Sequence, residues 1–503
     1  MNETQIIGQF FKRRAHEIER YQTEAEALQM NAFYTLLRQA AQTEWGRKYG
    51  YGEIKNYEEY TRRVPLQTYD DIKPYIKKMR QGTQNLLWPS DINWFAKSSG
   101  TTNDKSKFLP VSREGLKGIH YRGGADVIAL YLHQINPQSR LFSGKSLILG
   151  GSHVPNYNKK HSLVGDLSAI LIENIPSLAN LVRVPSKSIA LMDEWESKLE
   201  AIANSTLNKN VTSLSGVPSW FLVLIKRILE KTGKTSLEEV WPNLEVFFHG
   251  GVAFTPYREQ YKQIIHSPKM HYVETYNASE GFFGIQNDLS DPSMLLMIDY
   301  GMFYEFMPME DLDSPSPKTI MLPDVELDKN YALILNTNCG LWRYLIGDTV
   351  KFTSRNPYKF VITGRTKHFI NAFGEELMVD NAEKGLLRAC QATGAQIADY
   401  TAAPVFMDAN AKCRHQWLIE FAKTPSNLDT FAHTLDEALK EINSDYEAKR
   451  WKNIALQPLE IIPARKELFH DWLAQKGKLG GQHKIPRLSN NREYIDEMLK
   501  FNE

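Results

Sequence analysis

The feature that most constrains this chain is a regular alternation of strand-like and helix-like segments between residues 145 and 276. Short apolar stretches at 145–151, 211–217 and 244–251 have the composition of strands, and residues 189–204 and 219–231 between them have helical spacing. Such alternation is typical of sheets whose strands are joined by helices. Because ligands of open α/β sheets bind beyond the carboxyl ends of the strands, we expect the functional loops to follow these strands.

A β-rich portion and a tail of different character come next. Strands are predicted near residues 270–276, 294–306, 331–337 and 348–352, so the segment from about 294 to 364 is rich in strands. The tail has a helix near 380–393, an alternating strand at 416–421 and a helix at 428–443. We therefore expect an α/β protein with a large N-terminal α/β domain (1–366), which includes the β-rich subdomain, and a small mobile C-terminal α+β domain (367–503).

Helices are also predicted before the first strand. Residues 3–44 have an interrupted apolar stripe and are predicted to form helix, and a second helix is expected from Ser112 to about His133, with Ser112 as its N-cap.

Composition excludes several classes of protein. Lys and Arg total 60 against 59 for Asp and Glu, and this balance argues against nucleic acid or a charged membrane surface as a general partner. The three cysteines, Cys339, Cys390 and Cys413, are too widely spaced to indicate a disulfide framework or a zinc cluster. The apolar runs are far shorter than the ~20 residues that span a bilayer. We expect a cytoplasmic protein with no membrane partner.

One stretch, residues 98–110, has the composition of a phosphate-binding loop. Its first five residues are small or hydroxylated: Ser98, Ser99, Gly100, Thr101 and Thr102. Such residues present N–H groups and hydroxyls to anionic oxygens, and Lys105 and Lys107 add positive charge. A serine- and threonine-rich surface turn has the same composition, and the stretch lacks the Walker pattern, so taken alone it leaves both interpretations open.

Four later segments contain groups that a nucleotide needs. They are His249-Gly250-Gly251-Val252-Ala253-Phe254, Tyr276-Asn277-Ala278-Ser279-Glu280-Gly281, Trp342-Arg343-Tyr344-Leu345-Ile346-Gly347-Asp348 and Gly364-Arg365-Thr366-Lys367. Gly250 and Gly251 can form a surface behind the base, Asp348 can bind the ribose hydroxyls, and Glu280 can bind magnesium on the phosphates. Each segment alone is a weak signal, since a Gly-Asp pair is usually a turn and a Ser-Glu pair usually a helix cap.

Together, in this order, the segments resemble the ANL superfamily of adenylate-forming enzymes. More closely, the chain resembles the auxin-responsive acyl-acid amido synthetase family, whose three nucleotide motifs match residues 98–110, 276–281 and 344–348. The likeness also includes Phe303-Tyr304-Glu305-Phe306 and residues 481–487, and it extends over nearly all of the 503 residues. It implies the two-domain fold of adenylate-forming enzymes.

The resemblance also implies roles for the motif residues. Ser98, Ser99, Thr101 and Thr102, with Gly100 between them, would surround the β- and γ-phosphates, and Lys107 would assist catalysis there. Gly251, Val252, Ala253 and Phe254 would face the adenine, and the segment Tyr276, Asn277, Ala278, Ser279 and Glu280 would lie beside it. Glu280 would hold Mg²⁺, and Asp348 and Arg365 would bind the nucleoside. Lys367 falls at the position of the superfamily's hinge residue, and Lys484 would reach the α-phosphate during adenylation.

Two positions depart from the family pattern. Asp104 replaces a common glycine in the first motif, and Leu345 replaces an arginine in the third, where Arg343 could serve instead. A carboxylate near a triphosphate costs Coulomb energy unless it points outward or pairs with a lysine.

The predicted activity is ATP- and magnesium-dependent ligation of a small-molecule carboxylic acid to an amino acid through an acyl-adenylate, with release of AMP. The small domain would rotate about residues 364–367 between the two half-reactions, in a monomer or weak homo-oligomer. Two alternatives stay open: an acyl-CoA ligase with the same adenylation step, and a nucleotide-binding protein without ligase activity.

Overall fold

The computed structural model of the chain describes residues 3–99, 106–151, 162–252, 254, 257–312, 314–366, 369–406, 413–453, 455–476 and 485–502. The chain divides into two compact units. The larger unit comprises Met1–Ser98, Phe108–Gly251 and Gln263–Thr366, and the smaller unit comprises Ser99–Lys107, Val252–Lys262 and Lys367–Glu503.

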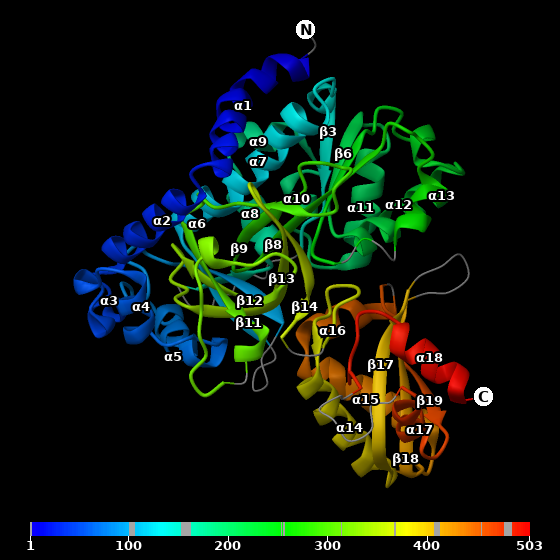
Figure 1. Cartoon of the computed structure of the whole chain (residues 1–503). Coiled ribbons are helices and arrows are strands. Elements are labelled where there is room, and N and C mark those ends of the chain that lie inside the picture. Colours follow the sequence, from blue (N-terminus) through cyan, green and yellow to red (C-terminus); the bar gives the residue numbers. More distant parts are fainter. Residues whose placement is uncertain are drawn as a thin grey trace. The chain divides into compact units, whose positions relative to one another are not determined.

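An 11-stranded sheet is the framework of the larger unit (Figure 1). In spatial order its strands are β11 (Met302–Pro308), β12 (Asn330–Thr337), β13 (Tyr344–Arg355), β14 (Tyr358–Arg365), β10 (Met294–Leu296), β9 (Gly281–Ile285), β8 (His271–Ala278), β7 (Val246–His249), β6 (Val211–Gly216), β3 (Lys145–Ile148) and β5 (Arg183–Val184). Pairing is parallel from β5 to β8 and antiparallel from β8 through β9 to β11.

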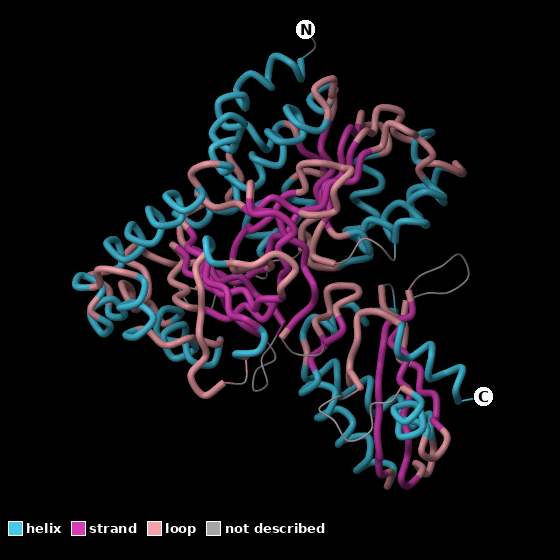
Figure 2. The backbone as a smooth tube through the Cα atoms, viewed as in Figure 1, coloured by secondary structure: helices cyan, strands magenta, loops and turns pink. Residues whose placement is uncertain are grey.

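The parallel half of the large sheet is formed by the segments in which strand-like and helix-like stretches alternate in the sequence. Its strands are two to eight residues long, and all four residues of β7 are buried, as expected of a strand covered on both faces. Figure 2 shows these strands in magenta with helices in cyan beside them. Because β3, β6 and β7 pair in parallel, their carboxyl ends lie at one edge of the sheet.

The antiparallel half confirms the predicted β-rich portion. Residues 294–306, which the sequence predicts as one strand, instead form β10 and β11 with a turn between them. Gly301 in this turn has a φ of +77°, in the left-handed region where glycine is favoured, so the chain can reverse here.

Helices lie before and between these strands, but the helix predicted at 189–204 is interrupted at residues 191–194. The helices are α1 (Glu3–Glu19), α2 (Ala25–Ala40), α3 (Glu44–Tyr49), α4 (Tyr57–Arg63), α5 (Tyr69–Arg80), α6 (Arg113–Gly115), α7 (Arg122–Leu130), α8 (Leu167–Glu173), α9 (Ser177–Leu181), α10 (Lys187–Ala190), α11 (Trp195–Thr206), α12 (Pro218–Thr232) and α13 (Arg258–Ile264). The Ser112 side chain accepts a hydrogen bond from the Gly115 N–H at 2.8 Å, which confirms Ser112 as an N-cap.

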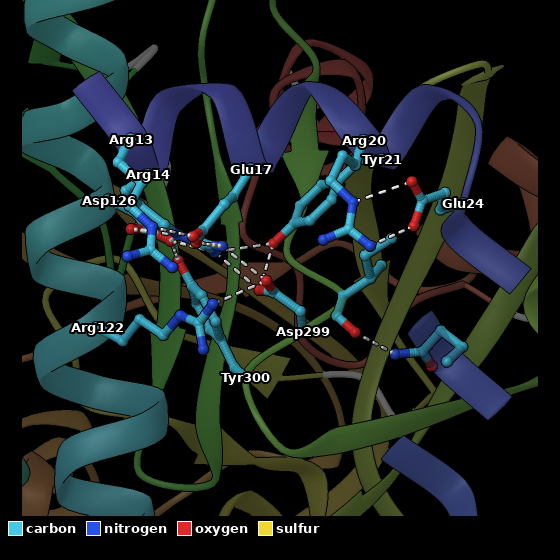
Figure 3. A network of polar contacts seen from close by, with 12 residues as sticks. Arg13, Arg14, Glu17, Arg20, Tyr21, Glu24, Arg122, Asp126, Asp299 and Tyr300 are labelled. Carbon is cyan, nitrogen blue, oxygen red and sulfur yellow. Dashed lines mark hydrogen bonds and ion pairs between the residues drawn. The ribbon is translucent and has the colours of Figure 1, made fainter. Parts of the chain in front are cut away.

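The predicted helix over residues 3–44 is broken by a short 3₁₀ turn, Arg20–Gln22. At this turn Tyr21 is buried and donates a hydrogen bond to Asp299 (Figure 3). Arg14 joins the same network, because its guanidinium donates to Asp126 and to Asp299 at 2.7 Å each. These contacts fasten α1 to α7 and to the turn between β10 and β11.

A separate three-stranded sheet has the order β2 (Ser106–Val111), β1 (Trp94–Ser99), β4 (Leu163–Gly165). Strand β1 pairs in parallel with β4, from Trp94 opposite Leu163 to Ala96 opposite Gly165. Strand β1 therefore leads into residues 100–105, the centre of the predicted phosphate loop, which lie outside the described residues.

The smaller unit contains a three-stranded sheet, a two-stranded hairpin and several helices, which confirms the predicted α+β tail. Its elements after residue 366 are β15 (Phe369–Ile370), β16 (Leu377–Met378), α14 (Val379–Thr393), β17 (Gln396–Val405), β18 (Arg414–Lys423), α15 (Leu428–Ile442), α16 (Ser444–Arg450), β19 (Glu460–Ala464), α17 (Leu468–Gln475) and α18 (Glu493–Asn502). Within the described ranges, every helix of the chain is too short or too polar to cross a bilayer.

Candidate active site

The turn after β7 has room only for glycine. A Cβ atom at Gly250 would lie 2.3 Å from the Thr275 carbonyl oxygen, and Gly251 has a φ of +82°. The Thr275 hydroxyl donates to the His249 carbonyl at 3.1 Å, so the turn lies tightly against β8. The two glycines predicted to lie behind the base thus form a tightly packed turn at the carboxyl edge of the sheet.

The second motif forms the tip of the hairpin between β8 and β9. Ala278 pairs with Gly281, and Ser279 and Glu280 form the two-residue connection. A Cβ atom at Gly281 would lie 2.7 Å from the Phe283 ring, so the strand after the turn also needs glycine. Glu280 is buried although it lies in a turn, while Asn277 is exposed. A tight turn thus holds one carboxylate at the end of β8.

Asp348 belongs to the third motif and accepts hydrogen bonds from residues of the second and fourth motifs. It lies opposite Arg365 in the pairing of β13 with β14, and the Arg365 Nε donates to its Oδ1 at 2.6 Å. The Tyr276 hydroxyl donates to its other oxygen, Oδ2. Gly347, just before it, has a φ of +96° and accepts a hydrogen bond from the Thr366 N–H at 2.8 Å. Residues from β8, β13 and β14 therefore meet at one carboxylate.

Burial and neighbouring charges determine the protonation state of the Tyr276 hydroxyl. Burial raises the pKa of Tyr276 well above its ordinary value, and the negative charges of Asp348 and Glu280 raise it further, against the opposing effect of Arg365. The hydroxyl therefore remains protonated and acts as a donor. Tyr276 donates to Asp348, and Glu280 lies four residues after Tyr276 in the turn of the same hairpin, so the two carboxylates predicted for ribose and magnesium lie on either side of this segment.

The remaining predicted residues are distributed as follows. Ser98 and Lys107 are half-buried on β1 and β2, and Ser99 ends β1. Val252 and Phe254 are buried residues of the smaller unit, and the Arg258 guanidinium lies 5.3 Å from the centre of the Phe254 ring. The others lie outside the described residues: Gly100, Thr101, Thr102, Ala253, Lys367 and Lys484.

Arg343 requires a correction, because its guanidinium is committed to the protein interior. Its Nε and Nη2 pair with Glu305 at 3.0 Å, in an ion pair whose side chains are 5% and 0% exposed. Its Nη1 donates to the carbonyls of Thr61 and Val64, and its Nη2 donates to Thr319. A guanidinium satisfied in this way is not available to a nucleotide, so Arg343 does not replace the arginine that the third motif lacks.

Sequence reasoning left Glu305 without a role and did not find the hydrogen bond between Tyr276 and Asp348. A signal for Glu305 was present, since it is a carboxylate within β11, whose seven residues are all buried. A charge in such a strand requires a partner. The contact between Tyr276 and Asp348 had no such signal, because 72 residues separate them.

Comparison with known families agrees with this arrangement. Models of the GH3 family N-terminal domain, central domain and C-terminal domain match residues 14–270, 295–365 and 380–493. The chain belongs to the GH3 family. The family predicted from the motifs is thereby confirmed.

Individual relatives extend over most of the chain. The indole-3-acetic acid-amido synthetase GH3.3 of Arabidopsis thaliana is 22% identical, over 93% of this chain and 90% of the relative. The 4-substituted benzoates-glutamate ligase GH3.12 of the same plant is 23% identical, over 86% of this chain and 87% of the relative. Their names describe ligases that form amides with amino acids, in agreement with the activity predicted from the motifs.

Solved structures show the same fold. The acyl acid amido synthetase AtGH3.15, in complex with 2,4-DB, has a TM-score of 0.62 and 21% identity, over 97% of this chain and 95% of the relative. A 2-hydroxyisobutyryl-CoA ligase has a TM-score of 0.56 and 12% identity, over 97% of this chain and 92% of the ligase. The expected fold of adenylate-forming enzymes is confirmed.

Proposed function

We propose that this GH3-family protein is an ATP-dependent ligase that activates a carboxylic acid as an acyl-adenylate and transfers the acyl group to the amine of an amino acid. The observation that carries the proposal is the meeting of Tyr276, Asp348 and Arg365, which come from three strands of the large sheet. The names of the GH3 relatives supply the reaction class.

In this proposal the nucleotide occupies the carboxyl edge of the sheet. The adenine lies against the Gly250-Gly251 turn and residues 252–254, and Asp348 accepts hydrogen bonds from the ribose hydroxyls. Residues 98–102 and Lys107 bind the β- and γ-phosphates, because hydroxyl, N–H and ammonium donors match phosphate oxygens. Lys484 approaches the α-phosphate during adenylation.

Glu280 is the proposed protein ligand of Mg²⁺. Among the described residues, no cluster of three or more His, Cys, Asp or Glu side chains could hold a metal ion. Magnesium in nucleotide sites commonly keeps several waters and takes one or two carboxylates together with phosphate oxygens, so a single carboxylate at the turn after β8 fits it. When bound, the ion would neutralise charge on the phosphates.

The chemistry requires activation because a carboxylate has no usable leaving group. A carboxylate oxygen attacks the α-phosphorus of ATP, an acyl–phosphate bond forms, and pyrophosphate leaves. The amine then attacks the acyl carbon, an amide forms, AMP leaves and the amine loses a proton. The protein contributes positioning and donors directed at the charge that develops on the phosphate oxygens.

The domain arrangement is part of the same proposal. Residues 1–366 would bind the nucleotide and the acid, and residues 367–503 would turn about the segment 364–367 between the two half-reactions. We also propose a cytoplasmic protein that acts as a monomer or weak homo-oligomer.

The test is a product analysis. The protein is supplied with ATP, Mg²⁺ and a pool of aromatic and aliphatic acids, together with amino acids or CoA, and the products are identified by mass. An N-acyl amino acid formed with AMP is the expected result. An acyl-CoA product would keep the adenylation step and overturn the acceptor, and absence of AMP with every acid would overturn ligase activity with these acids.

A further inference from the structure

We infer that the Tyr276 hydroxyl is a positioning group that, together with Arg365, orients the Asp348 carboxylate and so sets the selectivity for nucleotides with both ribose hydroxyls. The inference rests on the proposed nucleotide site and deepens it. It assigns to Tyr276 a task other than packing beside the base.

The hydrogen bonds leave Asp348 with a defined set of acceptors. An ionised carboxylate is an acceptor only, with about two lone-pair positions on each oxygen. Arg365 takes one position on Oδ1 and Tyr276 takes one on Oδ2. One position remains on each oxygen, and a ribose presents two adjacent hydroxyls that can each donate once. The protein thus uses one acceptor position on each carboxylate oxygen, and the other two positions can accept the hydroxyls of a 2′,3′-diol.

The two donors are held by different parts of the sheet, so they fix the carboxylate plane. Tyr276 belongs to β8 and Arg365 to β14, and Asp348 itself belongs to β13. The sheet order places β14, β10 and β9 between β13 and β8, so the hydrogen bond from Tyr276 joins strands that are not neighbours. A carboxylate bonded from two sides in this way cannot rotate freely about its last torsion.

The Tyr276 ring is itself immobilised. Its centre lies 4.8 Å from that of Phe283 and 6.1 Å from that of Phe360, and the residue is 7% exposed. The hydroxyl therefore cannot follow a moving carboxylate. Because the high pKa of Tyr276 keeps the hydroxyl protonated, its single hydrogen remains available to Asp348. The selectivity should consequently persist across the neutral pH range.

Removal of this one hydroxyl tests the inference. Tyr276→Phe keeps the ring and its packing but frees one side of the Asp348 carboxylate. Dissociation constants for ATP, 2′-deoxy-ATP and 3′-deoxy-ATP are measured by calorimetry without an acid substrate, so that turnover is not needed. In the wild-type protein we expect ATP to bind at least tenfold more tightly than either deoxynucleotide. In Tyr276→Phe we expect this ratio to fall to threefold or less.

Tyr304→Phe is the matched control. Tyr304 is a fully buried tyrosine of the same sheet, and its hydroxyl donates to the Met297 carbonyl at 2.8 Å. This variant also loses one buried hydrogen bond but leaves Asp348 untouched. Its ATP-to-deoxynucleotide ratio should equal that of the wild-type protein, and an equal fall in both variants would overturn the inference.

The other outcomes distinguish a failure of this inference from a failure of the proposed function. An unchanged ratio in Tyr276→Phe overturns the inference and leaves the proposed function standing. Absence of nucleotide binding by the wild-type protein overturns the proposed site and the inference with it. If Tyr276→Phe does not fold, Arg365→Lys tests the other side of the carboxylate. A ratio that stays at the wild-type value in that variant refutes the two-sided orientation of Asp348.

Discussion

Glu305→Gln should destabilise the protein strongly, because it removes the charge that compensates Arg343 in the interior. The Glu305 side chain is fully buried and accepts hydrogen bonds from Arg343 at 3.0 Å, Tyr57 at 2.9 Å, Thr319 at 2.9 Å and Asn336 at 3.0 Å. Glutamine has the same shape, so the substitution changes charge and hydrogen bonding without opening a cavity.

The magnitude follows from what Arg343 retains. Burial lowers the pKa of Arg343, but the charge of Glu305 raises it more, so the guanidinium stays charged in the folded protein. Without Glu305 this charge keeps only neutral partners, and breaking a buried ion pair by removing one member typically costs about 3–5 kcal/mol. The amide NH₂ of the glutamine would also face groups that now donate to Glu305. We therefore expect a loss of about 3–5 kcal/mol in the free energy of unfolding.

Urea unfolding followed by tryptophan fluorescence measures this loss. Trp342 is buried next to Arg343 and reports on the affected region. Glu24→Gln is the control, since Glu24 pairs with Arg20 at the surface, where the side chains are 41% and 54% exposed. Exposed ion pairs often contribute nothing measurable, so this control should unfold like the wild-type protein.

A double-mutant cycle with Arg343→Met completes the test. Removing both charges should cost less than the sum of the single losses, with an interaction energy of about 0.5–3 kcal/mol, because the second substitution no longer creates an unpaired charge. A loss below about 1 kcal/mol in Glu305→Gln, or strictly additive losses, would refute the role assigned to this pair.

Three further predictions concern the site and the stability of the larger unit. Glu280→Ala should abolish most acid-dependent AMP formation while the far-ultraviolet circular dichroism stays unchanged, and wild-type turnover would show that magnesium binds elsewhere. Gly250→Ala should weaken ATP binding, measured by calorimetry, because its Cβ would meet the Thr275 carbonyl at 2.3 Å, whereas Gly52→Ala, with no atom within 4 Å of the new Cβ, should have no effect. Burial lowers the pKa of His120 to about 4, below the 6.5 of an ordinary histidine. Protonation therefore favours the unfolded chain, and the free energy of unfolding should fall as pH drops from about 6.5 to about 4. In His120→Gln this pH dependence should be reduced. An unchanged dependence of the free energy of unfolding on pH would contradict the lowered pKa assigned to His120.

The sequence predicted local structure well where periodicity and backbone chemistry decide it. The strands at 211–217 and 331–337 and the N-cap at Ser112 are present nearly as expected, because strand character and helix capping depend on adjacent residues. The helix expected over 3–44 failed at Arg20–Gln22, where Tyr21 donates to Asp299, 278 residues further along the chain. The single strand expected at 294–306 failed at the turn that contains Gly301.

For the site, the sequence was sufficient to predict which side chains take part and which predicted strands lie next to them. The order of the motifs predicted the GH3 family, with Glu280 shortly after the strand expected near 270–276 and Asp348 at the start of the strand expected near 348–352. Packing of the folded chain set which charges pair. It placed Arg343 against Glu305 in the interior and Tyr276 and Arg365 on Asp348. The physical reason is that secondary structure depends on neighbours in the chain, whereas a buried charge takes its partner from whichever segment the packing brings into contact.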